Sequence, residues 1–146
     1  MINFEISVLI DQPVEVVFAF LSDPLNLPKW QKMVAKIEPV SSVPAGVGSR
    51  FNVHSKFLGR KIDGVMEITD YEAPAKFGFK NVAGPMQVRA TATLKTAGTG
   101  TKLTLNGQGE PAGMFKLAEG ALAAQVKSQM EENLKRLKSV LESGAK

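Results

Sequence analysis

The sequence contains no cysteine and only one histidine, His54. The absence of cysteine excludes a disulfide framework, a thiolate metal site and a cysteine nucleophile. Metal sites usually combine several histidine or carboxylate ligands, and a catalytic triad places histidine beside a nucleophile. His54 falls on the polar side of an alternating segment, which indicates a solvated position, with a pH-sensing or catalytic role as the alternative. We therefore expect neither a metal nor a cofactor.

Long hydrophobic runs are also missing. No apolar stretch approaches the roughly 18 residues that a membrane-spanning helix requires. Residues 1–13 have no basic segment and no small-residue cleavage site after an apolar run, so they do not resemble a signal peptide. Together with the absence of cysteine, these features predict a cytoplasmic protein without a transmembrane segment.

Charge of one sign is not concentrated anywhere in the chain. The 18 lysines and arginines exceed the 14 aspartates and glutamates, giving a net charge of +4, but acidic residues lie between the basic ones. A nucleic-acid-binding segment would need a basic run, so we expect no nucleic-acid partner. Gly46–Gly48 and Gly107–Gly109 are isolated GxG triplets without the spacing of a nucleotide-binding loop.

Alternating apolar and polar residues are abundant. From Ile2 to Ile10 the even-numbered residues are apolar and most of the others are polar, which indicates a half-buried strand. A period of two returns between residues 34 and 110, interrupted by short turns. The six further predicted strands are Val34–Val43, Gly48–Phe57, Arg60–Tyr71, Lys76–Val82, Met86–Thr96 and Thr101–Gln108. Consecutive strands with short turns favour an antiparallel meander.

Three segments have helical spacing instead. The first begins after Asp11, the predicted cap, with Pro13 in its first turn. The second is a short helix capped by Asp23 and limited by Pro28. The third, Met114–Leu141, has one apolar stripe and is roughly 40 Å long. Because a sheet with one apolar face needs a cover, this long helix is expected to lie across it.

This order of elements, with these residues at the joints, resembles the START/Bet v 1-like (SRPBCC) superfamily, and within it polyketide cyclase/dehydrase and lipid-transport-like members. The matching segments are Ile10–Phe18, Leu21–Pro24, Trp30, Thr69–Pro74, Gly98–Lys102 and Leu134–Lys138. The resemblance implies a single α+β domain over residues 1–146 with the helix-grip fold. In that fold a seven-stranded antiparallel curved sheet wraps around the long C-terminal helix, two short helices follow the first strand, and a cavity lies between sheet and helix. Relatives include carriers, hormone receptors, cyclases, oxygenase subunits and chaperone activators.

The apolar side of the predicted strands is nearly free of ionisable residues, and Ser55 is one of few polar residues on it. Such a wall favours an apolar ligand and lacks the titratable groups that acid–base catalysis needs. Methionines and small residues in the apolar set favour an adaptable cavity, although the same residues also fill ordinary cores. The predicted ligand-binding residues are Trp30, Phe51, Val53, Ser55, Met66, Phe77, Phe79, Met86, Val88, Met114, Leu117 and Ala121.

Three functions remain open at this level. The first is binding or transport of a lipid-like, aromatic or polyketide-like molecule. The second is a cyclase or dehydratase, in which Trp30 and Tyr71 are the residues to substitute first. Tyr71 is interpreted either as a strand-end aromatic with a solvated tip or as a group that orients a substrate. The third is an accessory interaction protein without a ligand, or a homodimer. No catalytic residue is assigned.

Overall fold

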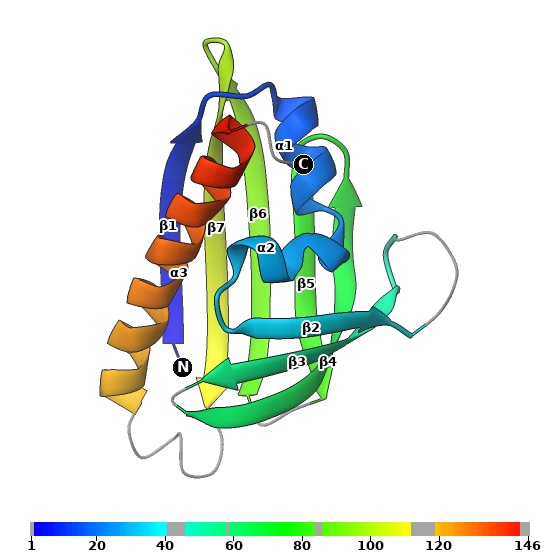
Figure 1. Cartoon of the computed structure of the whole chain (residues 1–146), viewed down its shortest axis with the longest axis vertical. Coiled ribbons are helices and arrows are strands. Elements are labelled where there is room, and N and C mark those ends of the chain that lie inside the picture. Colours follow the sequence, from blue (N-terminus) through cyan, green and yellow to red (C-terminus); the bar gives the residue numbers. More distant parts are fainter. Residues whose placement is uncertain (1, 41–45, 58, 84–85, 112–118, 144–146) are drawn as a thin grey trace.

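The computed structural model describes residues 2–40, 46–57, 59–83, 86–111 and 119–143. A curved antiparallel sheet of seven strands holds three helical segments and the long C-terminal helix on its inner face (Figure 1). The elements are β1 (Ile2–Ile10), α1 (Val14–Leu21), η1 (Pro24–Asn26), α2 (Leu27–Trp30), β2 (Val34–Pro39), β3 (Arg50–Phe57), β4 (Arg60–Glu72), β5 (Lys76–Ala83), β6 (Met86–Ala97), β7 (Gly100–Pro111) and α3 (Glu119–Glu142).

The strand order is β1-β7-β6-β5-β4-β3-β2, so β1 closes the meander beside β7 and forms one edge of the sheet. The alternation of β1 is reproduced in its burial: Asn3, Glu5, Ser7 and Leu9 are exposed, while the even-numbered residues are half-buried or buried. The predicted α+β class and the antiparallel meander are therefore confirmed. Gly98 supports the tight turn between β6 and β7 with φ at 62°, a region that side chains rarely adopt.

Several strand ends differ from the prediction: β4, β5 and β6 each end one residue later, and the last strand, predicted as Thr101–Gln108, runs from Gly100 to Pro111. Gly48, predicted to open the third strand of the chain, has φ at 92° and lies in the turn before β3. A positive φ removes a residue from the extended conformation, so β3 begins at Arg50 instead. The strand predicted as Val34–Val43 ends at Pro39 in the structure, and residues 41–45 lie outside its described part.

The structure places two boundaries of the short helices differently from the prediction. Asp11 does not cap α1, because the position before the helix is Pro13 and the backbone N–H of Asp11 donates to Glu142 Oε2 at 2.8 Å. Pro28 lies in the first turn of α2 and does not end it, because the first turn has no need of its missing N–H. Asp23 caps η1 as predicted, with its Oδ1 accepting from the N–H of Leu25 at 3.1 Å.

The long helix α3 lies along β1 and reaches α2 (Figure 1). Its buried stripe runs through Met130, Leu134, Leu137 and Leu141, as the helical spacing predicted. The predicted start of this helix at Met114 lies outside the described residues. No helix in the described ranges is both long and apolar enough to cross a membrane.

The C-terminal end of α3 is tied to the turn after β1. Lys138 Nζ donates to the Leu9 carbonyl at 2.6 Å and to Glu142 Oε2 at 2.7 Å. Gln12 Nε2 donates to the Leu141 carbonyl at 2.8 Å, and the buried Thr101 hydroxyl donates to the Gln12 carbonyl at 2.8 Å. These bonds fix one end of the helix on the sheet.

Candidate functional site

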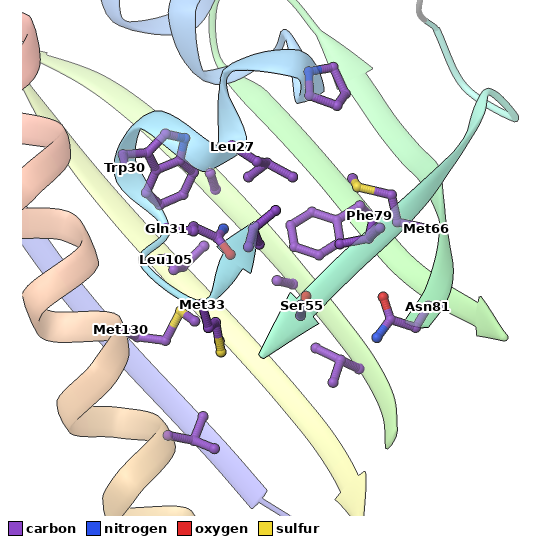
Figure 2. Close-up of a pocket in the computed structure, with 18 of the residues that line it drawn as sticks. Leu27, Trp30, Gln31, Met33, Ser55, Met66, Phe79, Asn81, Leu105 and Met130 are labelled. Atoms are coloured by element: carbon purple, nitrogen blue, oxygen red, sulfur yellow. The ribbon is translucent and has the colours of Figure 1, made fainter. Parts of the chain in front are cut away.

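A partly open cavity of about 180 Å³ lies beneath α2, between α3 and the inner face of the sheet (Figure 2). Every strand contributes to its wall, because the curved sheet turns one parity of each strand inward. The described residues that line it are Phe4, Leu21, Pro24, Leu27, Trp30, Gln31, Met33, Val34, Val53, Ser55, Ile62, Gly64, Met66, Phe77, Phe79, Asn81, Val88, Ala90, Ala92, Leu105, Val126 and Met130.

The wall is apolar apart from a few neutral polar groups. Among the described lining residues none is ionisable, and the polar side chains are those of Gln31, Ser55 and Asn81, together with the indole N–H of Trp30. A buried charge without a partner is strongly unfavourable, so this lining suits an uncharged molecule. It offers no described titratable group within the cavity to transfer a proton.

The structure brings most of the predicted ligand-binding residues together. Those that line the cavity are Trp30, Val53, Ser55, Met66, Phe77, Phe79 and Val88. They come from α2 and from four neighbouring strands, and they meet because each lies on the inward parity of its own strand or at the end of the short helix. That they contact a ligand stays a prediction.

The other predicted residues lie elsewhere. Phe51 is 6% exposed and packs in the hydrophobic core, outside the cavity lining. Ala121 is exposed on α3, so the expectation that it faces inward is corrected: the buried stripe of this helix starts nearer Met130. The side chain of Met86 and the whole of Met114 and Leu117 lie outside the described residues.

Several lining residues were missed in the sequence. Asn81 follows Phe77 and Phe79 on the same parity of β5, a signal that strand alternation could have supplied. Gln31 has no such signal, because it follows α2 in a non-periodic segment. Its backbone is held on both sides: its N–H donates to the Leu27 carbonyl at 2.8 Å, and its carbonyl accepts from Val34 at 3.1 Å.

Trp30 is buried at the end of α2, with 3% of its surface exposed, and its ring contributes to the cavity wall. Its Nε1–H is buried and has no hydrogen-bond acceptor among the described residues. Trp30 therefore belongs to the hydrophobic core and also borders the cavity. It is the only tryptophan in the chain, so its fluorescence reports on this site.

The buried side chain of Asn133 joins α3 to the segment after α2. Its Oδ1 accepts from the backbone N–H of Lys32 at 3.2 Å and from Gln129 Nε2 at 3.3 Å. Asn133 is 1% exposed, and a buried amide that lost these bonds would be costly. The helix and the residue next to Gln31 are thus connected by a direct hydrogen bond.

Tyr71 lies outside the cavity. Its ring packs edge-on against Phe18 and Phe77, with centroids 5.5 and 6.1 Å away. Its hydroxyl is 3.5 Å from Ser22 Oγ, and the side chain borders a surface groove next to α1. This position agrees with the interpretation of a strand-end aromatic with a solvated tip.

His54 lies on the outer face of the sheet and contacts two carboxylates. Its Nδ1 is 2.9 Å from Asp63 Oδ1, and its Nε2 is 3.0 Å from Glu38 Oε1. The hydrogen bond to Asp63, followed by the one to Glu38, raises the pKa of His54 above its usual value. Within the described ranges, no group of three or more histidine, cysteine or carboxylate side chains could hold a metal ion.

Residues 1–142 match the family model described as polyketide cyclase / dehydrase and lipid transport. The chain belongs to this family. The match spans almost all of the 146 residues, as the diffuse resemblance in the sequence predicted. No curated protein matches the chain.

Solved structures with low sequence identity share the fold of this chain. TTHA0849 from Thermus thermophilus has 21% identity and a TM-score of 0.84, with 99% of each chain covered. A START superfamily protein from Mycobacterium smegmatis has 14% identity and a TM-score of 0.76, covering 99% of this chain and 97% of its own. These likenesses concern the fold, and the predicted helix-grip fold is confirmed.

The di-domain ARO/CYC protein BexL is a further structural neighbour. It has 16% identity and a TM-score of 0.76, covering 97% of this chain and 47% of its own. The chain is therefore similar to one portion of a two-domain protein. At this identity the likeness concerns the fold alone.

Proposed function

We propose that this protein binds a hydrophobic small molecule in the cavity beneath α2. The observation that carries this proposal is the cavity of about 180 Å³ whose described lining is apolar and without ionisable groups. A solid core would have left no such space, since protein interiors pack like crystals of small molecules. Burial of apolar ligand surface contributes about 25 cal/mol per Å² toward binding.

The cavity volume limits the size of the ligand. An apolar cavity of about 150 Å³ is known to hold one benzene molecule, and sites for larger ligands span about 300–1,000 Å³. The 180 Å³ found here therefore suits a compact molecule of about one ring. Met33, Met66 and Met130 line the cavity, and their flexible side chains allow some adjustment to shape.

A cavity-filling variant tests the proposal. Ala90 on β6 is 5% exposed and lines the cavity, so Ala90→Ile places additional methyl groups in the space that a ligand would occupy. Thr91→Ile is the matched control, because the next residue of the same strand points to the opposite face. We expect native mass spectrometry and thermal-shift assays with small aromatic and aliphatic compounds to detect ligands for the wild type and Thr91→Ile, but not for Ala90→Ile. Absence of any bound compound in the wild type would contradict the proposal.

A cyclase or dehydratase activity is the alternative, and the family description includes both. In the described lining it would rely on orientation by Gln31, Ser55 and Asn81 and on exclusion of water, without a described acid or base. The lack of a described ionisable group favours binding over chemistry as the proposal. Turnover of a polyketide-like substrate that is lost in Ala90→Ile would favour the enzyme instead.

A further inference from the structure

The side chain of Gln31 makes no hydrogen bond within the part of the chain that the structure describes. Gln31 is 8% exposed and lines the cavity. Its backbone bonds to Leu27 and Val34, but its side chain makes no hydrogen bond to any other described residue. Figure 2 shows the amide on the cavity side of α2. An amide at the wall of a cavity can both donate to and accept from a guest, so Gln31 is placed to bind a polar group of a ligand.

Ser55 provides a second polar group on another wall. It lies on β3, where it pairs with Val34 of β2, three residues after Gln31. Its hydroxyl also makes no hydrogen bond to the described part of the chain. A carboxamide both donates and accepts, and so does a hydroxyl. Together these groups can satisfy an alcohol, a phenol or a carbonyl, whichever way its hydrogen points.

A ligand with a carboxylate group is expected to bind less tightly in the cavity than one with a hydroxyl group. The described lining contains no lysine, arginine or histidine that could balance its charge, and the nearest features are apolar side chains and neutral amides. Transferring an ion from water into such surroundings costs far more than transferring a hydroxyl. A pure hydrocarbon avoids that cost but leaves Gln31 unpaired.

We propose that the cavity selects compact neutral molecules with one hydroxyl or carbonyl group, which Gln31 binds by a hydrogen bond with Ser55 as a secondary contact. This inference rests on the proposed binding function and adds the chemical class of the ligand. Matching hydrocarbons and matching carboxylates are bound less tightly.

Three probes of similar shape test the inference: 4-propylphenol, propylbenzene and 4-ethylbenzoate. Affinities are measured by titration calorimetry, and emission of Trp30, excited at the red edge of its band, locates the probe in the cavity. We expect the wild type to bind the phenol about fivefold to tenfold more tightly than propylbenzene, as one hydrogen bond provides, and the benzoate most weakly. Gln31→Leu should lose that preference for the phenol while it binds propylbenzene at least as tightly.

Controls separate this inference from the function on which it rests. Gln125→Leu makes the same substitution at an exposed position of α3 and should behave as wild type. Ser55→Ala, which removes only one oxygen, should weaken binding of the phenol by a smaller factor than Gln31→Leu does. If the wild type binds propylbenzene or the benzoate as tightly as the phenol, the proposed selectivity is wrong but the binding function is supported. Wild type that binds none of the probes or of the wider compound panel overturns both.

Discussion

The ring of Phe4 packs directly on Gly107, its pairing partner across β1 and β7, and the same ring forms part of the cavity wall. A Cβ on Gly107 would overlap the ring atoms of Phe4. The glycine therefore leaves room for the aromatic ring on the inner face of the sheet. The size of residue 107 consequently influences the shape of the cavity.

Gly107→Ala is expected to push Phe4 toward the cavity and reduce its volume. Overpacking of this kind costs about 1–3 kcal/mol of stability. Gly109→Ala is the matched control on the same strand, where the nearest atom to a new Cβ is Val88 Cγ2 at 3.9 Å. Thermal unfolding and probe titration should show both effects for Gly107→Ala alone. Equal behaviour of the two variants would contradict the role of Gly107.

The bonds around Glu142 predict an acid-sensitive attachment of α3. The hydrogen bond from Lys138 and then the backbone N–H of Asp11 lower the pKa of Glu142 below its usual 4.5. A lowered pKa means that the contribution to stability is present above the usual value and is lost as pH falls through the lowered one. Glu142→Gln should therefore be less stable than wild type at neutral pH, with a smaller difference in acid. Urea unfolding of both proteins between neutral pH and about pH 3 measures this, with Glu131→Gln on the exposed side of α3 as the control.

His54 predicts the opposite pH dependence of stability, a loss as the pH rises. Because its pKa is raised, its contribution is complete below the usual 6.5 and is lost as pH rises through the higher value. Lys36 and Glu38 on β2 and Asp63 on β4 are the charged neighbours across the strands. As the only histidine, His54 gives one set of imidazole NMR signals. Their titration should occur above 6.5 in wild type and at lower pH in Asp63→Asn, and an unchanged midpoint would contradict the contact.

Tyr71→Phe is expected to leave ligand binding unchanged and to alter stability by less than about 1 kcal/mol, since among the described residues its hydroxyl makes one long contact, to Ser22. Phe77→Ala, in the cavity wall beside it, should cost about 3–5 kcal/mol and change probe affinity. Thermal unfolding and titration calorimetry of the two variants measure these differences in stability and affinity. A large loss of binding in Tyr71→Phe would show that its hydroxyl reaches the ligand.

Strand alternation predicted most of the fold and of the wall, because the sheet turns one parity inward. Residues such as Val53, Phe79 and Val88 could be placed on the inward side of the sheet on that basis, whereas the cavity itself was implied by the family resemblance. Gln31 could not, because its inward direction depends on how α2 ends and how the chain enters β2. Asp11 shows the same limit: its residue type suits a helix cap, but the C-terminal end of α3 supplies Glu142 as the partner of its backbone.

The hydrogen bond between Asn133 and the backbone of Lys32 has a mechanical consequence. Because α3 and the residue after Gln31 are linked there, a shift of the long helix away from the sheet draws the end of α2 along with it. Expansion of the cavity for a bulkier guest would therefore displace the glutamine amide as well as widen the apolar space. For the proposed ligand binding, we therefore expect the size and polarity of the guest to be coupled, since a larger guest would meet a differently placed amide.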